Sequence, residues 1–305
     1  MAPRTPLESV LATLDAIVAG KPAYREIADR FRPLFEARAQ VRQDLDEREL
    51  HTPPVDPVRL GQGAHLLAGV DPAVWADALA DSAATILPVL EQSFDLDGLP
   101  TRLLAASRED DRLLAGLARA RLEGDAQLLE NTSASLQSPT ATLAFALENV
   151  LAPVLGAVAA RVGESLSPGT ISPNTTCPVC GSLPTLSHLS QKDFTELEHL
   201  VGGGGRKFLR CGLCGHDWRV RRDACPSCGE ADPENRKILF AEGARRERVE
   251  VCSKCNTYCL CVDLREYDPA PSLDVLPLGL MHLDLIARKN ELSPVAPTIW
   301  NTLDD

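Results

Sequence analysis

Apolar residues recur every three or four positions through the first half of the chain, up to about residue 166. Leu7, Leu14 and Ile17 show this spacing, which places apolar side chains on one face of a helix. The pattern continues through 22–50, 99–107, 109–121, 123–136 and 139–164, and Asp71-Pro72 has the signature of a helix N-terminus. Residues 1–166 are therefore predicted to form a helical domain with a shared Leu/Ala core.

The pattern changes at 167–176, where prolines, a glycine and hydroxyl residues predict a linker. Short strand-like segments follow, and turn residues separate them. The predicted strands are 183–190, 206–210, 217–221, 237–241, 248–251 and 258–264. The segment 273–305 is predicted to hold a last helix, compromised by Pro277, and a tail. We therefore expect an α+β protein: a helical domain, two small rubredoxin-like or zinc-ribbon β modules, and a C-terminal helix.

Four Cys-x-x-Cys pairs lie in the β region. They are Cys177/Cys180, Cys211/Cys214, Cys225/Cys228 and Cys252/Cys255. Two such pairs supply the four thiolates of one tetrahedral metal site, so eight cysteines predict two sites. The simplest assignment is consecutive, with the first two pairs in a ribbon at 177–224 and the last two in a ribbon at 225–272. A crossed assignment, pairing first with third and second with fourth, would interleave the modules.

The residue after each pair supports metal-binding turns. It is glycine three times, at Gly181, Gly215 and Gly229, and asparagine once, at Asn256. Such turns need a positive φ after the second cysteine, and glycine and asparagine reach it most easily. Both sites use four protein ligands, which leaves no open position for metal-assisted hydrolysis. Soft sulfur ligands suit iron and zinc equally, so the spacing does not choose the metal.

Charge and composition limit the class of protein. The chain has 305 residues, is 44% hydrophobic and carries a net charge of −12, which argues against a general nucleic-acid binder. Glu8 and Asp15 interrupt the apolar run that a signal peptide needs, and no stretch approaches a membrane span of ~18 apolar residues. A cytoplasmic location without membrane contact is expected, where cysteines bind metal rather than form disulfides.

Basic residues gather near the first two cysteine pairs, against the single acid Asp217. They are Arg206, Lys207, Arg210, Arg219, Arg221 and Arg222. They either offset the thiolate charge or form a docking patch for an acidic partner or nucleic acid. On the docking interpretation, Arg210, Trp218 and Arg219 are the candidate partner-binding residues. We find no catalytic Ser/His/Asp set and no acid–base carboxylate pair, so an enzyme is not expected.

Two further cysteines, Cys259 and Cys261, lie outside the pairs. Residues two apart share one face of a strand, while Leu260, Val262 and Leu264 would fill the opposite, core-facing side. The two thiols are interpreted either as a spare pair for metal or sulfur handling or as small packed side chains.

The family resemblance lies in CPVCGSLP at 177–184, GGRKFLRCGLCGHDWRVRRDACPSCG at 204–229 and CSKCNTY at 252–258. These segments resemble FdhE, the formate dehydrogenase accessory proteins. The resemblance implies a cytoplasmic, non-enzymatic maturation factor, or chaperone, that binds the catalytic subunit of formate dehydrogenase. It also implies iron in both rubredoxin-like sites, with zinc as the alternative. The eight paired cysteines match the family, whereas Cys259 and Cys261 depart from it.

Two other classes of function remain open from the sequence. One is a zinc-ribbon protein that binds nucleic acid, which draws on the basic cluster. The other is a small iron redox protein, which two metal sites and spare thiols permit. The oligomeric state is not indicated by the sequence.

Overall fold

The computed structural model describes residues 4–163, 165–166, 171–172, 174–190, 205–241 and 243–302. The chain divides into two compact units. Unit 1 comprises Met1–Leu166, Pro178–Gly181 and Leu213–Gly215, and unit 2 comprises Ser167–Cys177, Ser182–Gly212 and His216–Asp305. Residues 167–170 and 173 of the predicted linker lie outside the described residues.

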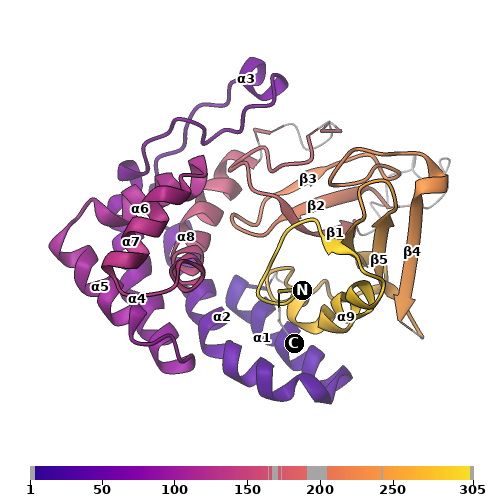
Figure 1. Cartoon of the computed structure of the whole chain (residues 1–305), viewed down its shortest axis with the longest axis horizontal. Coiled ribbons are helices and arrows are strands. Elements are labelled where there is room, and N and C mark those ends of the chain that lie inside the picture. The colour runs from indigo at the N-terminus through magenta and orange to yellow at the C-terminus, as the bar shows by residue number, and fades with distance from the viewer. Residues whose placement is uncertain are drawn as a thin grey trace. The chain divides into compact units, whose positions relative to one another are not determined.

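Unit 1 is built from helices (Figure 1). They are α1 (Pro6–Gly20), α2 (Arg25–Asp46), α3 (Pro57–Gly61), α4 (Ala76–Ser93), α5 (Leu99–Glu109), α6 (Leu113–Glu123), α7 (Ala126–Ser135) and α8 (Thr140–Gly163), with short 3-10 helices at Pro22–Tyr24 and Pro72–Trp75. Asp71 caps the second of these by accepting from the Ala73 backbone N–H, as the sequence predicts. The predicted start of α6 at 109 is early, because Asp110 ends α5 and its carboxylate accepts from the Arg112 backbone N–H.

The core of unit 1 lies where α2, α4 and α8 pack together. The hydroxyl of Ser82 on α4 is fully buried and donates to the Val150 carbonyl on α8 at 2.7 Å. Arg161 near the end of α8 donates to the carbonyls of Leu45 and Arg48 at 2.7 and 2.6 Å. The last carbonyls of a helix have no partner within it, so this arginine completes the C-terminal end of α2.

Two helical segments, Pro72–Ser93 and Thr140–Gly163, are long and apolar enough to cross a membrane. The expectation that no stretch approaches that length is therefore wrong. Most of the second segment, which is α8, is buried among the other helices of unit 1. A core helix that is surrounded by neighbours is apolar on all sides for that reason.

Unit 2 contains one mixed sheet (Figure 1). Its strands are β1 (Pro184–Leu189), β2 (Lys207–Cys211), β3 (Asp217–Arg219), β4 (Arg236–Ala241), β5 (Ala244–Cys252), β6 (Thr257–Asp263) and β7 (Ser293–Pro294). The order is β3-β2-β1-β6-β5-β4, and β7 pairs with the start of β6. All six strands predicted from the sequence are present, with boundaries shifted by a few residues. The α+β prediction is confirmed.

The two predicted ribbons meet in this sheet through a parallel pair. β1 and β2 belong to the first ribbon and pair antiparallel, while β5 and β6 belong to the second and also pair antiparallel. β1 then pairs parallel with β6, with Leu186 opposite Leu260 and Leu189 opposite Asp263. The boundary predicted between 177–224 and 225–272 stays a proposal, since strands from both segments form one sheet.

The two faces of the sheet differ in chemistry because successive residues of a strand point to opposite sides. On one face, Leu186, Val249 and Leu260 join a buried apolar cluster with residues of α9 (Met281–Lys289). The other face carries a buried ion pair between Lys207 of β2 and Glu250 of β5. Burial by itself raises the pKa of Glu250, but Lys207 together with Arg248 and Cys261 outweighs burial and holds that pKa below its usual value.

The C-terminal helix begins later than expected. Pro277 lies in the first turn of a 3-10 helix at Leu276–Leu280, and α9 starts at Met281. Asp284 of α9 is buried and accepts a hydrogen bond from the Tyr258 hydroxyl of β6 at 2.7 Å. Burial raises the pKa of Asp284 to about 6, from an ordinary 3.8, and the Tyr258 bond only partly opposes the rise.

Replacing Lys207 by methionine should destabilise the sheet. The substitution leaves the Glu250 carboxylate buried with Arg248 as its remaining cation, 3.2 Å away. Breaking one side of a buried pair costs about 3 kcal/mol. Hydrogen–deuterium exchange of β2 and β5 measures the loss separately from the helices. The matched control is Arg221→Met, at an exposed pair with Asp223, and protection equal in the two variants would contradict the assignment.

Stability of the sheet should fall as pH rises from about 4 to about 7, because of Asp284. In this range the folded protein retains a carboxyl proton that the unfolded chain has lost, and a shift of roughly two pKa units corresponds to about 3 kcal/mol. Asp284→Asn should flatten this pH dependence. The measurement is hydrogen–deuterium exchange of β6 and α9 in urea at several pH values. Tyr258→Phe should steepen the pH dependence. The Tyr258 hydrogen bond stabilises the ionised carboxylate, so its loss would raise the pKa of Asp284 further. An unchanged slope in Asp284→Asn would refute the prediction.

Candidate metal centres

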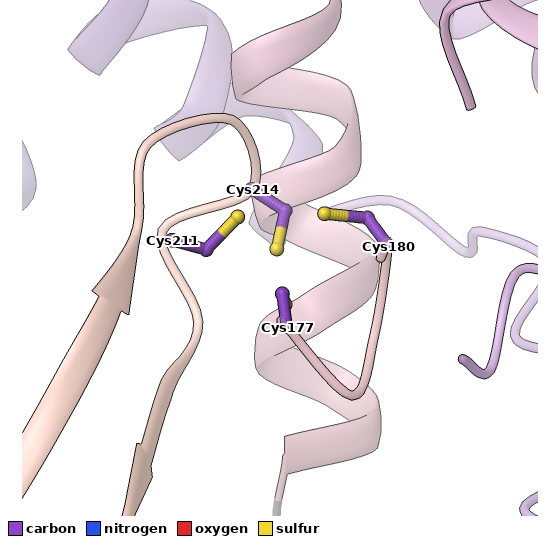
Figure 2. A group of neighbouring side chains, drawn as sticks. All are labelled: Cys177, Cys180, Cys211 and Cys214. Carbon is purple, nitrogen blue, oxygen red and sulfur yellow. The ribbon is translucent and has the colours of Figure 1, made fainter. Parts of the chain in front are cut away.

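The first group of cysteines comes from two turns of the chain. One turn precedes β1, and the other connects β2 to β3. The Sγ atoms of Cys177, Cys180, Cys211 and Cys214 all lie within 4.8 Å of one another, and all four residues are buried. Figure 2 shows their side chains turned toward a common centre. The pairs come together in consecutive order, as the simpler of the two sequence assignments predicts.

The second group comprises Cys225, Cys228, Cys252 and Cys255, again with all Sγ atoms within 4.8 Å. The Cys225–Cys255 and Cys228–Cys252 Sγ distances are both 3.8 Å. A regular tetrahedron with metal–sulfur bonds of about 2.3 Å has sulfur–sulfur edges of about 3.8 Å. The donor set and its spacing therefore fit a tetrahedral, thiolate-bound ion such as zinc or iron.

Every pair has the same turn after its second cysteine. Gly181, Gly215, Gly229 and Asn256 have φ values of +78°, +65°, +73° and +55°. This positive φ is the feature that the glycines and the asparagine predict, and it turns the chain back toward the sulfur atoms. The side-chain amide of Asn256 also donates to the Glu291 carbonyl at 2.9 Å, which holds the one turn that lacks glycine.

A backbone hydrogen bond closes three of these turns in the same way. The N–H of the first cysteine donates to the carbonyl five residues later: Cys177 to Ser182, Cys211 to His216 and Cys225 to Glu230, at 2.9, 3.0 and 2.8 Å. In the fourth turn, Cys252 stands opposite Thr257, also five residues later, in the β5–β6 pair. The four turns are thus built alike and aim their sulfur atoms alike.

The thiols of the second group differ in pKa because their local surroundings differ. Burial raises the pKa of Cys252, but backbone N–H groups of Cys255 and Lys254 outweigh it and bring that pKa to about 6. For Cys228, desolvation and the neighbouring thiols raise the pKa to about 12. A bound divalent ion needs all four as thiolates, so metal binding would release protons here.

The sequence did not identify His65 and Gly156, which lie against the first group within unit 1. A Cβ atom on Gly181 would come within 2.6 Å of the His65 ring. A Cβ atom on Gly156 of α8 would come within 2.8 Å of the Arg42 guanidinium and 3.5 Å of the Cys214 carbonyl oxygen. Neither residue belongs to a motif, and only the packing of the chain reveals them.

Three of the six residues of the basic cluster are paired with carboxylates. Lys207 pairs with Glu250, Arg221 with Asp223, and Arg210 with both Asp217 and Asp274 at 2.8 and 2.7 Å. These cations therefore offset carboxylates rather than thiolates, which neither of the two interpretations of the sequence expects. Pairing of this kind also reduces the positive surface that a nucleic-acid interface requires.

The three candidate partner-binding residues lie on adjacent strands. Arg210 stands opposite Asp217, and Trp218 of β3 stands opposite Leu209. Trp218 is buried, and its indole N–H donates to the Asn174 carbonyl at 3.3 Å. Arg219 is half-buried at the end of β3. A direct role in docking stays a prediction for all three residues.

Cys259 and Cys261 are buried on the polar face of the sheet. Burial raises the pKa of both thiols to about 12, so they are neither nucleophilic nor placed with either cysteine group in the described part of the chain. The opposite side of the strand carries Leu260, Val262 and Leu264, which join the apolar cluster as expected. Packing is therefore the interpretation that the structure favours for these two cysteines.

The fold and the two cysteine groups define a class of protein: a helical unit combined with a pair of four-cysteine ribbons of the rubredoxin or zinc-ribbon type. A search of solved structures finds the same fold in the FdhE protein from Pseudomonas aeruginosa, with a TM-score of 0.63 over 98% of this chain and 96% of that one. The sequence identity of that pair is 21%.

Curated sequences point to the same family. An FdhE homolog from Aquifex aeolicus is 31% identical over 113 residues, which is 37% of this chain and 37% of the relative. An FdhE homolog from Edwardsiella ictaluri is 28% identical over 186 residues, 61% of this chain and 50% of the relative. The alignments thus span half or less of these relatives, and no family model matches. The resemblance to the FdhE family is confirmed.

Two glycine substitutions should separate backbone strain from crowding at the metal-binding turns. Gly229→Ala adds a Cβ that meets nothing within 4 Å, so it should cost only the positive φ, about 1–2 kcal/mol. Gly181→Ala incurs the same strain and also overlaps the His65 ring, so it should lower metal content and stability further. Adding His65→Ala should relieve part of the second cost. Equal losses in the two single variants would show that His65 does not confine the turn.

Proposed function

We propose that this protein is a non-enzymatic accessory factor in the maturation of formate dehydrogenase. The observation that carries the proposal is the pair of closed four-cysteine groups within a chain that has the FdhE fold. Four thiolate ligands leave no position at which a substrate would meet the metal. A metal held in such a group organises the surrounding ribbon rather than activating water.

Each four-cysteine group is proposed to hold one metal ion. The family resemblance favours iron in rubredoxin-like sites, and zinc is the alternative because four soft sulfur atoms suit both. Metal analysis together with the visible spectrum separates the two, since iron–thiolate sites absorb visible light and zinc–thiolate sites do not. The eight paired cysteines are the proposed ligands, and no other residue is assigned to this role.

The proposed partner is the catalytic subunit of formate dehydrogenase, met in the cytoplasm. Of the three docking candidates, Arg219 is proposed to make the direct contact. Arg210 is held by two carboxylates and Trp218 is buried, so these two would instead hold β2 and β3 in place beneath the contact. This division of roles keeps all three residues in the docking region.

Removing the protein from cells that make it should lower formate dehydrogenase activity while the catalytic polypeptide is still synthesised. Re-expression of the wild-type chain should restore activity. A variant with Cys225 and Cys228 both replaced by serine should restore less, because the second group would lose two ligands. Activity that is unaffected by removal would sink the proposal.

A binding experiment with purified catalytic subunit tests the docking surface. Arg219→Glu should weaken binding of the catalytic subunit by at least roughly tenfold, because charge reversal at an interface penalises a complementary partner. The matched control is Arg221→Glu, two residues away at an exposed ion pair. Equal affinity for both variants, measured with purified catalytic subunit, would remove Arg219 from the proposed contact.

A further inference from the structure

The two four-cysteine groups differ sharply in their access to solvent. All four cysteines of the first group are at most 2% exposed. In the second group Cys225 and Cys252 are equally buried, but Cys228 is exposed and Cys255 is half-buried. The ligand sets are chemically identical, so this difference in access distinguishes the two groups.

Part of the first cysteine turn, Pro178–Gly181, belongs to unit 1 and is held by other residues of that unit. The backbone N–H groups of Leu66 and Leu67 donate to the carbonyls of Pro178 and Val179 at 2.8 and 2.9 Å. These two acceptors are the residues between Cys177 and Cys180. Any ligand that approached through this turn would first have to break both hydrogen bonds.

The neighbouring side chains close the same group further. The His65 ring packs directly on Gly181, and a Cβ at position 156 of α8 would stand in ordinary contact, at 3.5 Å, with the Cys214 carbonyl oxygen of the second turn. An incoming ligand that displaced Cys180 or Cys214 from a bound ion would thus have to move atoms packed against the two cysteine turns. Local opening of packed, hydrogen-bonded structure is rare, and exchange that depends on it is slow.

The second group has an open side at Cys228. A Cβ atom placed on the following residue, Gly229, would meet nothing within 4 Å. The nearby Lys254–Glu230 ion pair lies at the surface, with the lysine side chain 61% exposed. Among the described residues, no backbone hydrogen bond from Pro226, Ser227 or Cys228 links this turn to another part of the chain, in contrast to Pro178 and Val179.

We propose that the second group is an exchangeable metal site and that Cys228 is the ligand that yields its place, whereas the first group releases its ion only slowly. This inference rests on the proposed loading of both groups with metal. The incoming ligand is a soft donor, such as an external thiolate, which reaches the ion from the open side. The site would serve for uptake or hand-over of a thiophilic divalent ion.

The exchange step is a ligand substitution without a change in oxidation state. A bond forms between the ion and the incoming thiolate as the bond between the ion and Cys228 Sγ breaks. Four thiolates surround the ion before and after, so the charge of the site is conserved. The released Cys228 thiolate takes up a proton from water, and Cys225, Cys252 and Cys255 keep the ion in place until further substitution.

The test uses the full chain loaded with two zinc ions and then mixed with excess 4-(2-pyridylazo)resorcinol. One zinc ion per chain should leave at least roughly tenfold faster than the other, since the slower release must first open two hydrogen bonds. Alkylation by N-ethylmaleimide during the fast phase, followed by peptide mass spectrometry, should modify Cys228 and Cys255 before any cysteine of the first group. Modification of the first group ahead of the second would overturn the inference.

Matched variants identify the phases independently. Cys228→Ser should remove or further accelerate the fast phase and leave the slow one unchanged, while Cys180→Ser, at the equivalent position of the first group, should affect only the slow phase. The wild-type alkylation pattern decides the question if either variant fails to fold. Two zinc ions that leave at one rate overturn this inference alone, whereas a chain that takes up no zinc overturns the proposed metal loading as well.

Discussion

Four thiolates that converge within 4.8 Å repel one another unless a cation stands between them. This constraint applies to both cysteine groups, because each gathers four sulfur ligands at the ends of short strands. The turns contribute backbone N–H groups and a positive φ that direct sulfur inward, but they cannot cancel the charge. Binding of a metal ion would therefore be coupled to folding of the cysteine region, as in other small domains that depend on a structural ion.

The sheet connects the two cysteine groups across unit 2. Antiparallel pairs extend from the cysteines along the strands, and the parallel pair of β1 with β6 joins one ribbon to the other. α9 then covers the apolar face, while the Lys207–Glu250 pair occupies the opposite one. The strands hold each cysteine group from one side. The two groups differ in how far their turns are covered, because Cys180 is buried and Cys228 is exposed.

The sequence predicts the features that have local signals. Cysteine spacing predicts the two groups, the following glycines and asparagine predict the turns, and alternating short segments predict the strands. The parallel pairing leaves no such signal, since β1 and β6 are far apart in sequence: the Ser187 hydroxyl of β1 donates to the Leu260 carbonyl of β6, 73 residues away. The sequence also gives no sign that Lys207 is buried. Its buried partner, Glu250, is 43 residues away.

The candidate sites show the same limit at finer scale. The eight cysteines are equivalent in sequence, yet burial distinguishes Cys228 from Cys180 through contacts made by Leu66, His65 and other distant residues. Trp218 is a candidate contact residue in sequence because it lies close to the first two cysteine pairs, but its side chain is buried and its indole N–H donates to the Asn174 carbonyl. Such differences depend on which segments meet in space, and this information is spread over the whole chain.

The late position of β6 has a consequence for synthesis of the chain on the ribosome. Cys177 to Cys214 emerge before any residue of β6 exists, so the first thiolate group can close around an ion while its sheet is still missing a central strand. Pairing of β1 with β6 must wait until residue 263 has left the exit tunnel, and strand pairing over such a long separation is slow. During that interval the β1 edge is exposed to other chains, and a metal ion bound early by the first group would limit the conformations that this edge explores.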